Sequence, residues 1–400
     1  KQNKTHTNTQ NIHNTPSNMP ELPEVEAMRK QVERQLRGAT ITSVDARESG
    51  GGPRTGKFDS IVIGERVKEQ TFVKTLQNRR ITAVKRIGKQ IWLELSGDGA
   101  HLLFHCGMTG CLSVEGAKRL KFQYFGKGKE WPPKFTKLQL VCKKKGAPGN
   151  KSKRLVFFDP RRLGRILLRE QPRSEPPICH LAPDPLVELP RLDVFCEVLS
   201  KSNMPVKAVL LDQTKLVAGV GNWVADEVLH AARIHPAAIA KTLSKAQVAS
   251  LRRSISSIVR AAVKVDADAE RFPKKWLFHK RWQAGSQRRD VQLPGHGGTL
   301  VFRTVAGRTT ALVPSRQKMG LLASSGRPRR QQQQQQQKQQ QPKQQQRQQK
   351  QRQQPAREQQ RQQQGQVGQR KGKQSISRQR PRGSTKTKPK ATVMKAKRAR

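Results

Sequence analysis

Acidic side chains are scarce in this sequence of 400 residues, which has 28 Asp and Glu against 80 Lys and Arg and a formal net charge of +52. A globular region this basic repels itself unless a polyanion neutralises it. Nucleic acid or an anionic membrane surface is therefore the expected partner, and enzymes of small neutral metabolites are disfavoured. Residues 321–400 have 23 basic residues and one acidic residue, a charge of +22, and residues 1–320 carry the remaining +30.

Cysteine pairs and long apolar runs are missing as well. The 5 cysteines are an odd number and none forms a CxxC pair, which argues against a disulfide framework and a four-cysteine zinc site and fits a reducing compartment. No apolar run reaches the roughly 18 residues that a membrane span needs. Residues 1–18 lack the apolar segment of a secretory signal. We expect no metal, no cofactor and no membrane contact.

The sequence changes character at Met19, its first methionine. Residues 1–18 are rich in Asn, Gln and Thr without apolar periodicity, so we expect them to be disordered. We expect translation to begin at Met19, with proteolytic processing as the alternative. After Pro20, apolar side chains recur at spacings of three and four, which predicts an amphipathic helix ended by Gly38. These apolar residues are Leu22, Val25, Met28, Val32 and Leu36.

Residues 40–169 consist of short β-branched runs separated by turn signals, which predicts an all-β sandwich. The runs are TITSVDA, FDSIVIG, RRITAVKRIGKQIWLEL, AHLLFH, TKLQLVC, RLVFFD and GRILLR. The basic stretch 143–154 predicts a hairpin loop, and the proline-rich stretch 172–186 predicts an interdomain linker. Residues 190–265 have helical periodicity, with a glycine-containing turn at 218–221 and Asn222 as the N-cap of the helix that follows.

Residues 270–314 have the pattern of short strands. From about residue 327 the sequence consists mainly of Gln, Lys and Arg, a composition that cannot form a hydrophobic core. The predicted fold class is α+β and multidomain. Its segments are a disordered or artefactual extension (1–19), a β-sandwich domain with a leading helix (20–170), a linker (171–187), a helical domain (188–270), a β-hairpin segment (271–320) and a disordered tail (321–400).

Residues 19–26, MPELPEVE, resemble the N-terminus of the formamidopyrimidine-DNA glycosylase and endonuclease VIII family, and further motifs extend the resemblance over residues 20–317. In that family the initiator methionine is removed and the new N-terminal proline is the nucleophile, which implies this role for Pro20. A secondary amine that attacks C1′ of a damaged nucleotide forms an iminium, an electron sink for later β-elimination. The resemblance implies that Glu21 is the general acid and base at the sugar ring and that Glu24 positions the site. An ordinary helix start is the alternative.

The sequence departs from the family at this point, because 19 residues precede Pro20. Its nitrogen is then a tertiary amide without a lone pair for attack. Three explanations remain open: translation starts at Met19, the chain is processed, or the protein has no lyase activity.

Three further motifs match the family around the damaged nucleotide. Lys89 in IGK corresponds to a lysine that reaches the phosphate and the ring oxygen. HCGMTG and DPRRLG resemble the segments that fill the void left by a flipped-out nucleotide, which implies this role for Met108, Arg161 and Leu163. Leu163 replaces the usual phenylalanine, which weakens stacking between bases. The alternatives are a solvated lysine, a core methionine and a buried strand-edge leucine.

The helical segment resembles the family's helix-two-turn-helix DNA-binding module, in which Asn222 and Lys207 are expected to contact phosphate. Residues 276–314 resemble the zincless finger of plant and animal members. Within it, Arg308 corresponds to the arginine that grips phosphates beside the flipped nucleotide. An exposed arginine in a hairpin turn is the alternative.

The resemblance implies a bifunctional DNA glycosylase and abasic-site lyase of base excision repair that removes oxidised bases and nicks by β,δ-elimination. Expected substrates are formamidopyrimidines and hydantoins in double-stranded DNA, with 8-oxoguanine as a further candidate that depends on the loop 264–276. We expect a monomer in the nucleus, with an organelle as the alternative location. The competing hypotheses are a catalytically silent DNA- or RNA-binding protein with a blocked proline and a ribosome-associated RNA-binding factor.

Overall fold

The computed structural model describes residues 20–122, 131–146, 151–282, 291–293 and 298–319. All of them belong to one compact unit that spans residues 1–324. The predictions for residues 1–19, the centre of the 143–154 loop and the tail fall outside the described residues. Within the described ranges, no helix is both long and apolar enough to cross a membrane.

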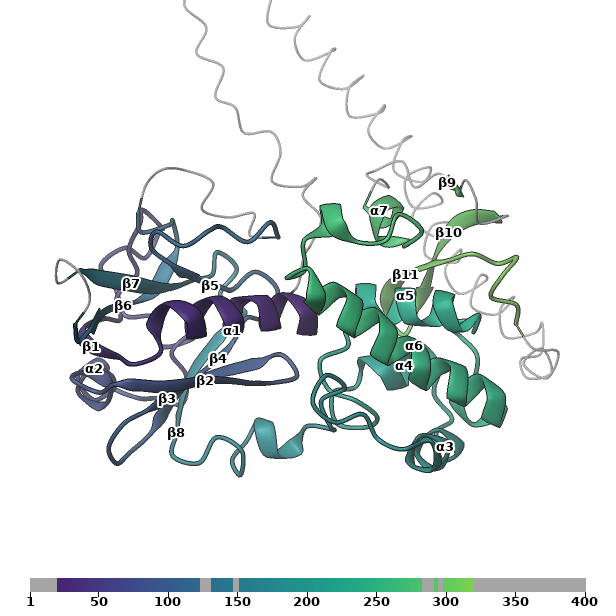
Figure 1. The fold of residues 1–400 in the computed structure, drawn as a ribbon, viewed down its shortest axis with the longest axis horizontal. Coiled ribbons are helices and arrows are strands. Elements are labelled where there is room, and N and C mark those ends of the chain that lie inside the picture. The colour runs from purple at the N-terminus through teal and green to yellow at the C-terminus, as the bar shows by residue number, and fades with distance from the viewer. Residues whose placement is uncertain (1–19, 123–130, 147–150, 283–290, 294–297, 320–400) are drawn as a thin grey trace, which may run out of the picture. The chain divides into compact units, whose positions relative to one another are not determined.

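Two four-stranded antiparallel sheets form the N-terminal half and confirm the predicted sandwich (Figure 1). One sheet has the order β1-β6-β7-β5 and the other β2-β3-β4-β8. Phe104 and Phe157, one from each sheet, stack at 5.7 Å between ring centroids in the shared core. The strands are β1 (Ala39–Asp45), β2 (Ile81–Ile87), β3 (Gln90–Leu95), β4 (His101–His105), β5 (Cys111–Val114), β6 (Thr136–Lys144), β7 (Ser152–Phe158) and β8 (Arg165–Arg169).

The predicted leading helix is present as α1 (Leu22–Leu36), and its apolar face is buried against β2 and β5. The predicted strand at 58–64 is wrong: this segment is a turn with isolated bridges at Phe58 and Ile63. Its chain bends because the Asp59 carbonyl accepts the N–H groups of Val62 and Ile63. The helix α2 (Glu69–Leu76) was not predicted.

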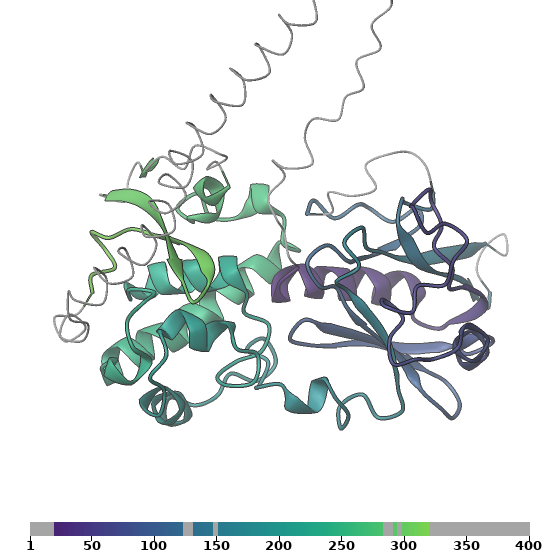
Figure 2. The same cartoon turned by 180° about the vertical axis from the view of Figure 1, so that it is seen from behind.

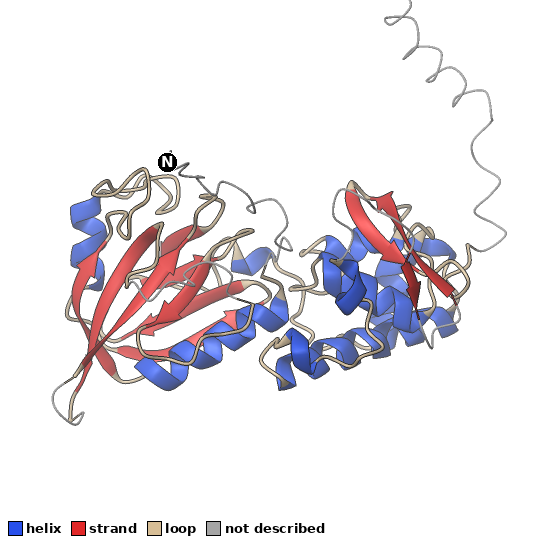
Figure 3. Cartoon of the chain, turned by 90° about the horizontal axis from the view of Figure 1, so that it is seen from above, coloured by secondary structure: helices blue, strands red, loops and turns tan. Residues whose placement is uncertain are grey.

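Helices gather in the C-terminal half, as Figure 3 shows. The longest, α6, packs against both α5 and α1. The hairpin of β10 (Gly298–Val305) and β11 (Arg308–Leu312) packs on α5 (Figure 2), and β9 (Val291–Leu293) adds a third strand to the two that were predicted. The helices are α3 (Leu192–Ser200), α4 (Val206–Leu211), α5 (Asn222–Ala232), α6 (Lys245–Lys264) and α7 (Phe278–Arg281), with 3₁₀ turns η2 (Ile178–His180), η3 (Ala240–Thr242) and η4 (Ala269–Arg271).

A buried glutamate joins α5 to α7. Glu227 accepts the backbone N–H of Phe278 at 2.6 Å, and desolvation raises the pKa of its carboxyl to about 8. Because the folded protein then holds a proton that the unfolded chain releases near pH 4.5, this group's contribution to stability is complete below that pH and is lost as the pH rises towards 8.

We therefore expect Glu227→Gln to flatten the pH dependence of unfolding. Between pH 5 and pH 8, the free energy of unfolding of the wild type should fall relative to the variant by up to about 1.4 kcal/mol per pH unit. Urea unfolding at several pH values measures the difference. Parallel curves for the two proteins would contradict the buried, protonated state of Glu227.

Candidate active site and nucleic-acid interface

Glu21 joins the start of α1 to the start of α5. Its carboxylate accepts the N–H groups of Gly221 at 2.9 Å, Trp223 at 2.9 Å and Val224 at 3.1 Å. Glu21 thus caps a helix 200 residues away and places its carboxyl beside the turn at 218–221. Desolvation raises the pKa of Glu21, although the charge of Lys89 and the N–H groups of Trp223 and Val224 oppose the shift. Buried Pro20 directly precedes Glu21.

Glu24 lies one turn further along α1 and is buried. Its Oε2 accepts the backbone N–H of Glu21 at 3.1 Å. Desolvation and repulsion from the Glu21 carboxylate raise the pKa of Glu24 to about 8. Glu24 therefore holds the backbone next to Pro20, and its environment favours the protonated carboxyl.

Lys89 lies in the turn between β2 and β3 and faces these carboxylates. Its Nζ donates to the Val220 carbonyl at 3.1 Å. Desolvation lowers the pKa of Lys89, the carboxylates of Glu21 and Glu24 oppose this effect, and the charge of Arg308 adds to it. Lys89 bonds to Val220 and Glu21 bonds to Gly221, so both side chains meet at the 218–221 turn.

One end of the sheet β2-β3-β4-β8 gathers three of the predicted segments. Gln90 pairs with His105 and His105 pairs with Arg165, so the residues next to them share this end. Lys89 precedes Gln90, the turn with Met108 follows His105, and Leu163 lies just before Arg165. Desolvation, the largest cause, together with the charges of Lys89 and Arg165 lowers the pKa of His105 to about 4.

The segments with Met108 and Leu163 are locked to each other by Asp159. Its carboxylate accepts the Thr109 hydroxyl at 2.5 Å and the N–H of Gly164 at 2.7 Å. Leu163 is 42% exposed, which excludes the buried strand-edge alternative, and Met108 is only partly buried. Exposed apolar side chains held on a rigid turn are suited to insertion between bases. Arg161 in the same loop is also exposed.

Arg308 projects from the two-residue turn between β10 and β11. Ala306 and Gly307 both have positive φ angles, 52° and 70°, and Arg308 follows them in an exposed position. The next carbonyl, that of Thr309, accepts the Asn222 side-chain amide at 3.0 Å. This bond fixes the hairpin that carries Arg308 on the N-terminus of α5.

Two expectations for the helical domain need correction. Gly221 is the N-cap of α5, and Asn222 is its first helical residue because the Glu21 carboxylate already occupies the capping position. Lys207 was expected to contact phosphate but is fully buried, and its ammonium contacts Asp226 at 2.6 Å and the Thr310 hydroxyl at 2.7 Å. Desolvation lowers the pKa of Lys207 to about 6.

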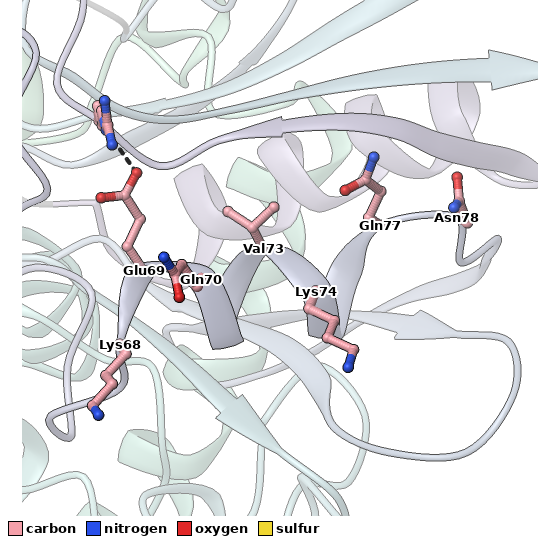
Figure 4. A pocket seen from close by; sticks show the side chains of 8 residues that line it. Lys68, Glu69, Gln70, Val73, Lys74, Gln77 and Asn78 are labelled. Atoms are coloured by element: carbon pink, nitrogen blue, oxygen red, sulfur yellow. Dashed lines mark hydrogen bonds and ion pairs between the residues drawn. The ribbon is translucent and has the colours of Figure 1, made fainter.

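A hollow along α2 is unrelated to these residues (Figure 4). Arg47 and Glu69 form an ion pair at 2.7 Å at its edge. None of the predicted site residues lines it. Among the described residues, no group of three or more His, Cys, Asp or Glu side chains could hold a metal ion.

Two family profiles match the chain. One, described as the formamidopyrimidine-DNA glycosylase N-terminal domain, matches residues 19–166, and the other, described as the H2TH domain of the same enzyme, matches residues 181–274. The chain belongs to the formamidopyrimidine-DNA glycosylase family.

Relatives in this family come from plants and bacteria. The formamidopyrimidine-DNA glycosylase of Arabidopsis thaliana is 35% identical over 303 residues, 75% of this chain and 71% of that protein. The enzyme of Thermus thermophilus is 31% identical over 311 residues, 76% of this chain and 100% of that protein. A crystal structure of the Lactococcus lactis enzyme bound non-covalently to DNA with an AP site is 27% identical with a TM-score of 0.57, and it covers 74% of this chain and 99% of that one.

Sequence reasoning missed the acidic residues that support this glycosylase site. Asp159 ties two loops together, and Asp226 accepts Lys207, Arg281 and the N–H of Ala311. Asp159 is the first residue of the DPRRLG motif and Asp226 lies in the first half of α5, but a lone aspartate gives no sequence signal of its partners.

Proposed function

We propose that the chain is a DNA glycosylase and abasic-site lyase of base excision repair that acts on oxidised bases in double-stranded DNA. The observation that carries this proposal is that Glu21, which follows Pro20, bonds to Gly221 while Lys89 bonds to the adjoining Val220, in a member of this family. Glu24 holds the Glu21 amide, and the hairpin with Arg308 is bonded to the start of α5. The solved relatives include complexes with DNA that contains an abasic site or a formamidopyrimidine.

The proposed reaction starts from a free amine on Pro20. The nitrogen attacks C1′ and gives up its proton, the N-glycosidic bond breaks, and the base leaves with its bonding electrons and takes up a proton. Glu21, whose pKa is raised by burial, donates a proton to the sugar-ring oxygen as the ring opens and the iminium forms. The iminium then accepts the electrons released when C2′ loses a proton, and the 3′-phosphate departs; a second elimination releases the 5′-phosphate.

Charge and shape supply the rest of the proposed site. Lys89 and Arg308 hold the phosphates beside the extruded nucleotide, with the guanidinium suited to a bidentate contact. Met108, Arg161 and Leu163 occupy the vacated space in the duplex, which offsets a cost of roughly a few kcal/mol for base extrusion. Asn222 contributes by holding the Arg308 hairpin.

We further propose a zincless finger and a preference for formamidopyrimidines and hydantoins. The β10–β11 hairpin forms in a part of the sequence without cysteine, since the last cysteine is Cys196. In the segment after α6, Phe272 and Trp276 are buried and pack against Trp223, so these side chains are turned into the protein rather than over a base. We also propose that the protein is a monomer and that basic clusters in the tail sequence direct it to the nucleus.

A panel of lesion duplexes tests this function. Protein expressed from Met19 is incubated with duplexes that carry a formamidopyrimidine, a hydantoin, 8-oxoguanine or no lesion. We expect excision and nicking of the first two, with slower removal of 8-oxoguanine. Tight binding without excision of any lesion would support a silent DNA-binding protein, and tighter binding to structured RNA than to every lesion duplex would support an RNA-binding factor.

Replacing the exposed wedge separates base removal from nicking. We expect Leu163→Ala to slow single-turnover excision from a duplex about tenfold, because the void is then less well filled at a cost of about 1 to 2 kcal/mol. Nicking of a preformed abasic site should change by less than about twofold, since no damaged base has to leave the stack. Equal losses in both assays would contradict a wedge role.

A further inference from the structure

The turn that carries Lys89 is held by a buried ion pair from outside its own hairpin. Asp184 lies in the connection between β8 and α3, and its Oδ2 accepts the N–H of Gly88 at 2.7 Å. The same carboxylate binds both terminal nitrogens of the Arg86 guanidinium. Arg86 in turn donates to the Gly88 carbonyl at 2.9 Å. Both polar groups of the residue before Lys89 are therefore fixed.

The ion pair extends from the turn into α1. Arg86 Nε donates to Glu26 Oε2 at 2.8 Å, so one guanidinium connects α1, β2 and the β8–α3 connection. Asp184 and Arg86 are 5% and 7% exposed. Taking such charges out of water costs about as much as their attraction returns, so a pair of this kind adds little net stability. The ion pair instead fixes the position of the backbone directly before Lys89.

The turn also has little freedom on its other side. Gly88 has φ +56°, and a Cβ there would lie 3.0 Å from the Ala218 Cβ and 3.3 Å from the Gly219 nitrogen. Pro183, next to Asp184, accepts the N–H of Ala218. The connection between the two halves thus contacts both the Lys89 turn and the 218–221 turn.

We propose that Asp184 is a positioning residue that sets the place of Lys89 against the reacting sugar, through Arg86 and Gly88. This inference rests on the proposed function of Lys89. It links the conformation of the β8–α3 connection to the reaction rate, because a shift of the connection moves the backbone amide directly before the lysine. A displacement of about 1 Å in a reacting group can reduce a rate by about 10²-fold.

The test compares Asp184→Asn with Lys89→Met and with the double variant in protein expressed from Met19. We expect Asp184→Asn to slow single-turnover excision of a formamidopyrimidine about 10-fold to 100-fold, with duplex affinity changed by less than about twofold. In the Lys89→Met background the same substitution should have no further effect, because residues that act through one another are not additive. A wild-type rate for Asp184→Asn, or rate losses that multiply, would overturn the proposal.

Glu48→Gln is the matched control. Glu48 is 1% exposed and pairs with the equally buried Lys137, which also pairs with Asp59 and through it with Arg162 beside Leu163. Because this network does not include Asp184 or Gly88, we expect the control to lower the unfolding midpoint without slowing the nicking of a preformed abasic site. If Asp184→Asn fails to fold, the double variant Arg86→Gln with Asp184→Asn removes the β2 cation that would otherwise lose its partner in the connection. This variant should show the same slow rate, and a wild-type rate would overturn the proposal.

Hydrogen exchange at the Gly88 amide separates this inference from the proposed function. We expect Asp184→Asn to lose protection at this amide and Glu48→Gln to retain it. If Asp184→Asn keeps protection at this amide, Asp184 does not hold the turn before Lys89, and the inference fails even when the enzyme is active. If Asp184→Asn loses protection at this amide but the wild-type protein excises no lesion, then Asp184 does hold the Gly88 turn and the proposed glycosylase function is wrong.

Discussion

Glu21→Gln is expected to lower the single-turnover rate of base excision by about 10²-fold to 10⁴-fold, the usual contribution of a general acid. Glutamine keeps one oxygen, which can accept the N–H groups of Gly221 and Val224, whereas its amide nitrogen then faces the Trp223 N–H, so the start of α5 retains part of its cap. It cannot deliver the proton that the opening sugar ring requires. Rapid-quench assays on a formamidopyrimidine duplex measure the loss.

Glu227→Gln is the control for this substitution. Glu227 is another buried carboxyl with a raised pKa, but it accepts the backbone N–H of Phe278 at the start of α7. We expect its replacement to leave excision within about twofold of the wild type, because the Glu227 carboxyl bonds to α7 and not to Glu21, Glu24 or Lys89. A Glu21→Gln enzyme that loses less than tenfold would reject Glu21 as the proton donor.

Lys89→Met is expected to slow excision by about 10²-fold, comparable with the loss of one charge-stabilising donor in an active site. Methionine retains the apolar stem but removes the charge that faces Glu21 and Glu24. Binding of undamaged duplex should weaken only slightly, because one phosphate contact among many is lost.

Lys85→Met on the same hairpin is the comparison. Lys85 is exposed on β2 and has no hydrogen bond from its side chain in the described structure. We expect it to leave excision unchanged, because an exposed lysine on β2 does not face Glu21 or Glu24. Equal excision rates for the two variants would show that Lys89 acts only as a general phosphate contact.

Local patterns predicted the elements that carry the site. The spacing of apolar residues from Leu22 to Leu36 produced α1, and the β-branched runs produced the sandwich. The segment 58–64 was wrongly predicted to be a strand because its apolar run is typical of one. In the structure the Asp59 carbonyl accepts N–H groups of Val62 and Ile63, so the chain turns. Burial and period alone do not distinguish these outcomes.

Long-range contacts could not be predicted from one sequence. Nothing near Glu21 indicates that it caps a helix that begins at Asn222, and this cap displaces Asn222 from the role that its residue type favours. Lys207 has the charge of a phosphate contact, but Asp226 and Thr310 bury it. Residue type predicts chemistry, whereas tertiary partners decide whether that chemistry reaches the ligand.

The central claim, that the amine of Pro20 is the nucleophile, is tested most directly by borohydride reduction with abasic-site DNA followed by mass spectrometry of the protein peptides. Protein with Pro20 as its first residue should give a covalent adduct on the N-terminal peptide, and protein in which residues 1–19 still precede Pro20 should give none. An absence of adduct with Pro20 free, or equal trapping by both forms, would contradict the account.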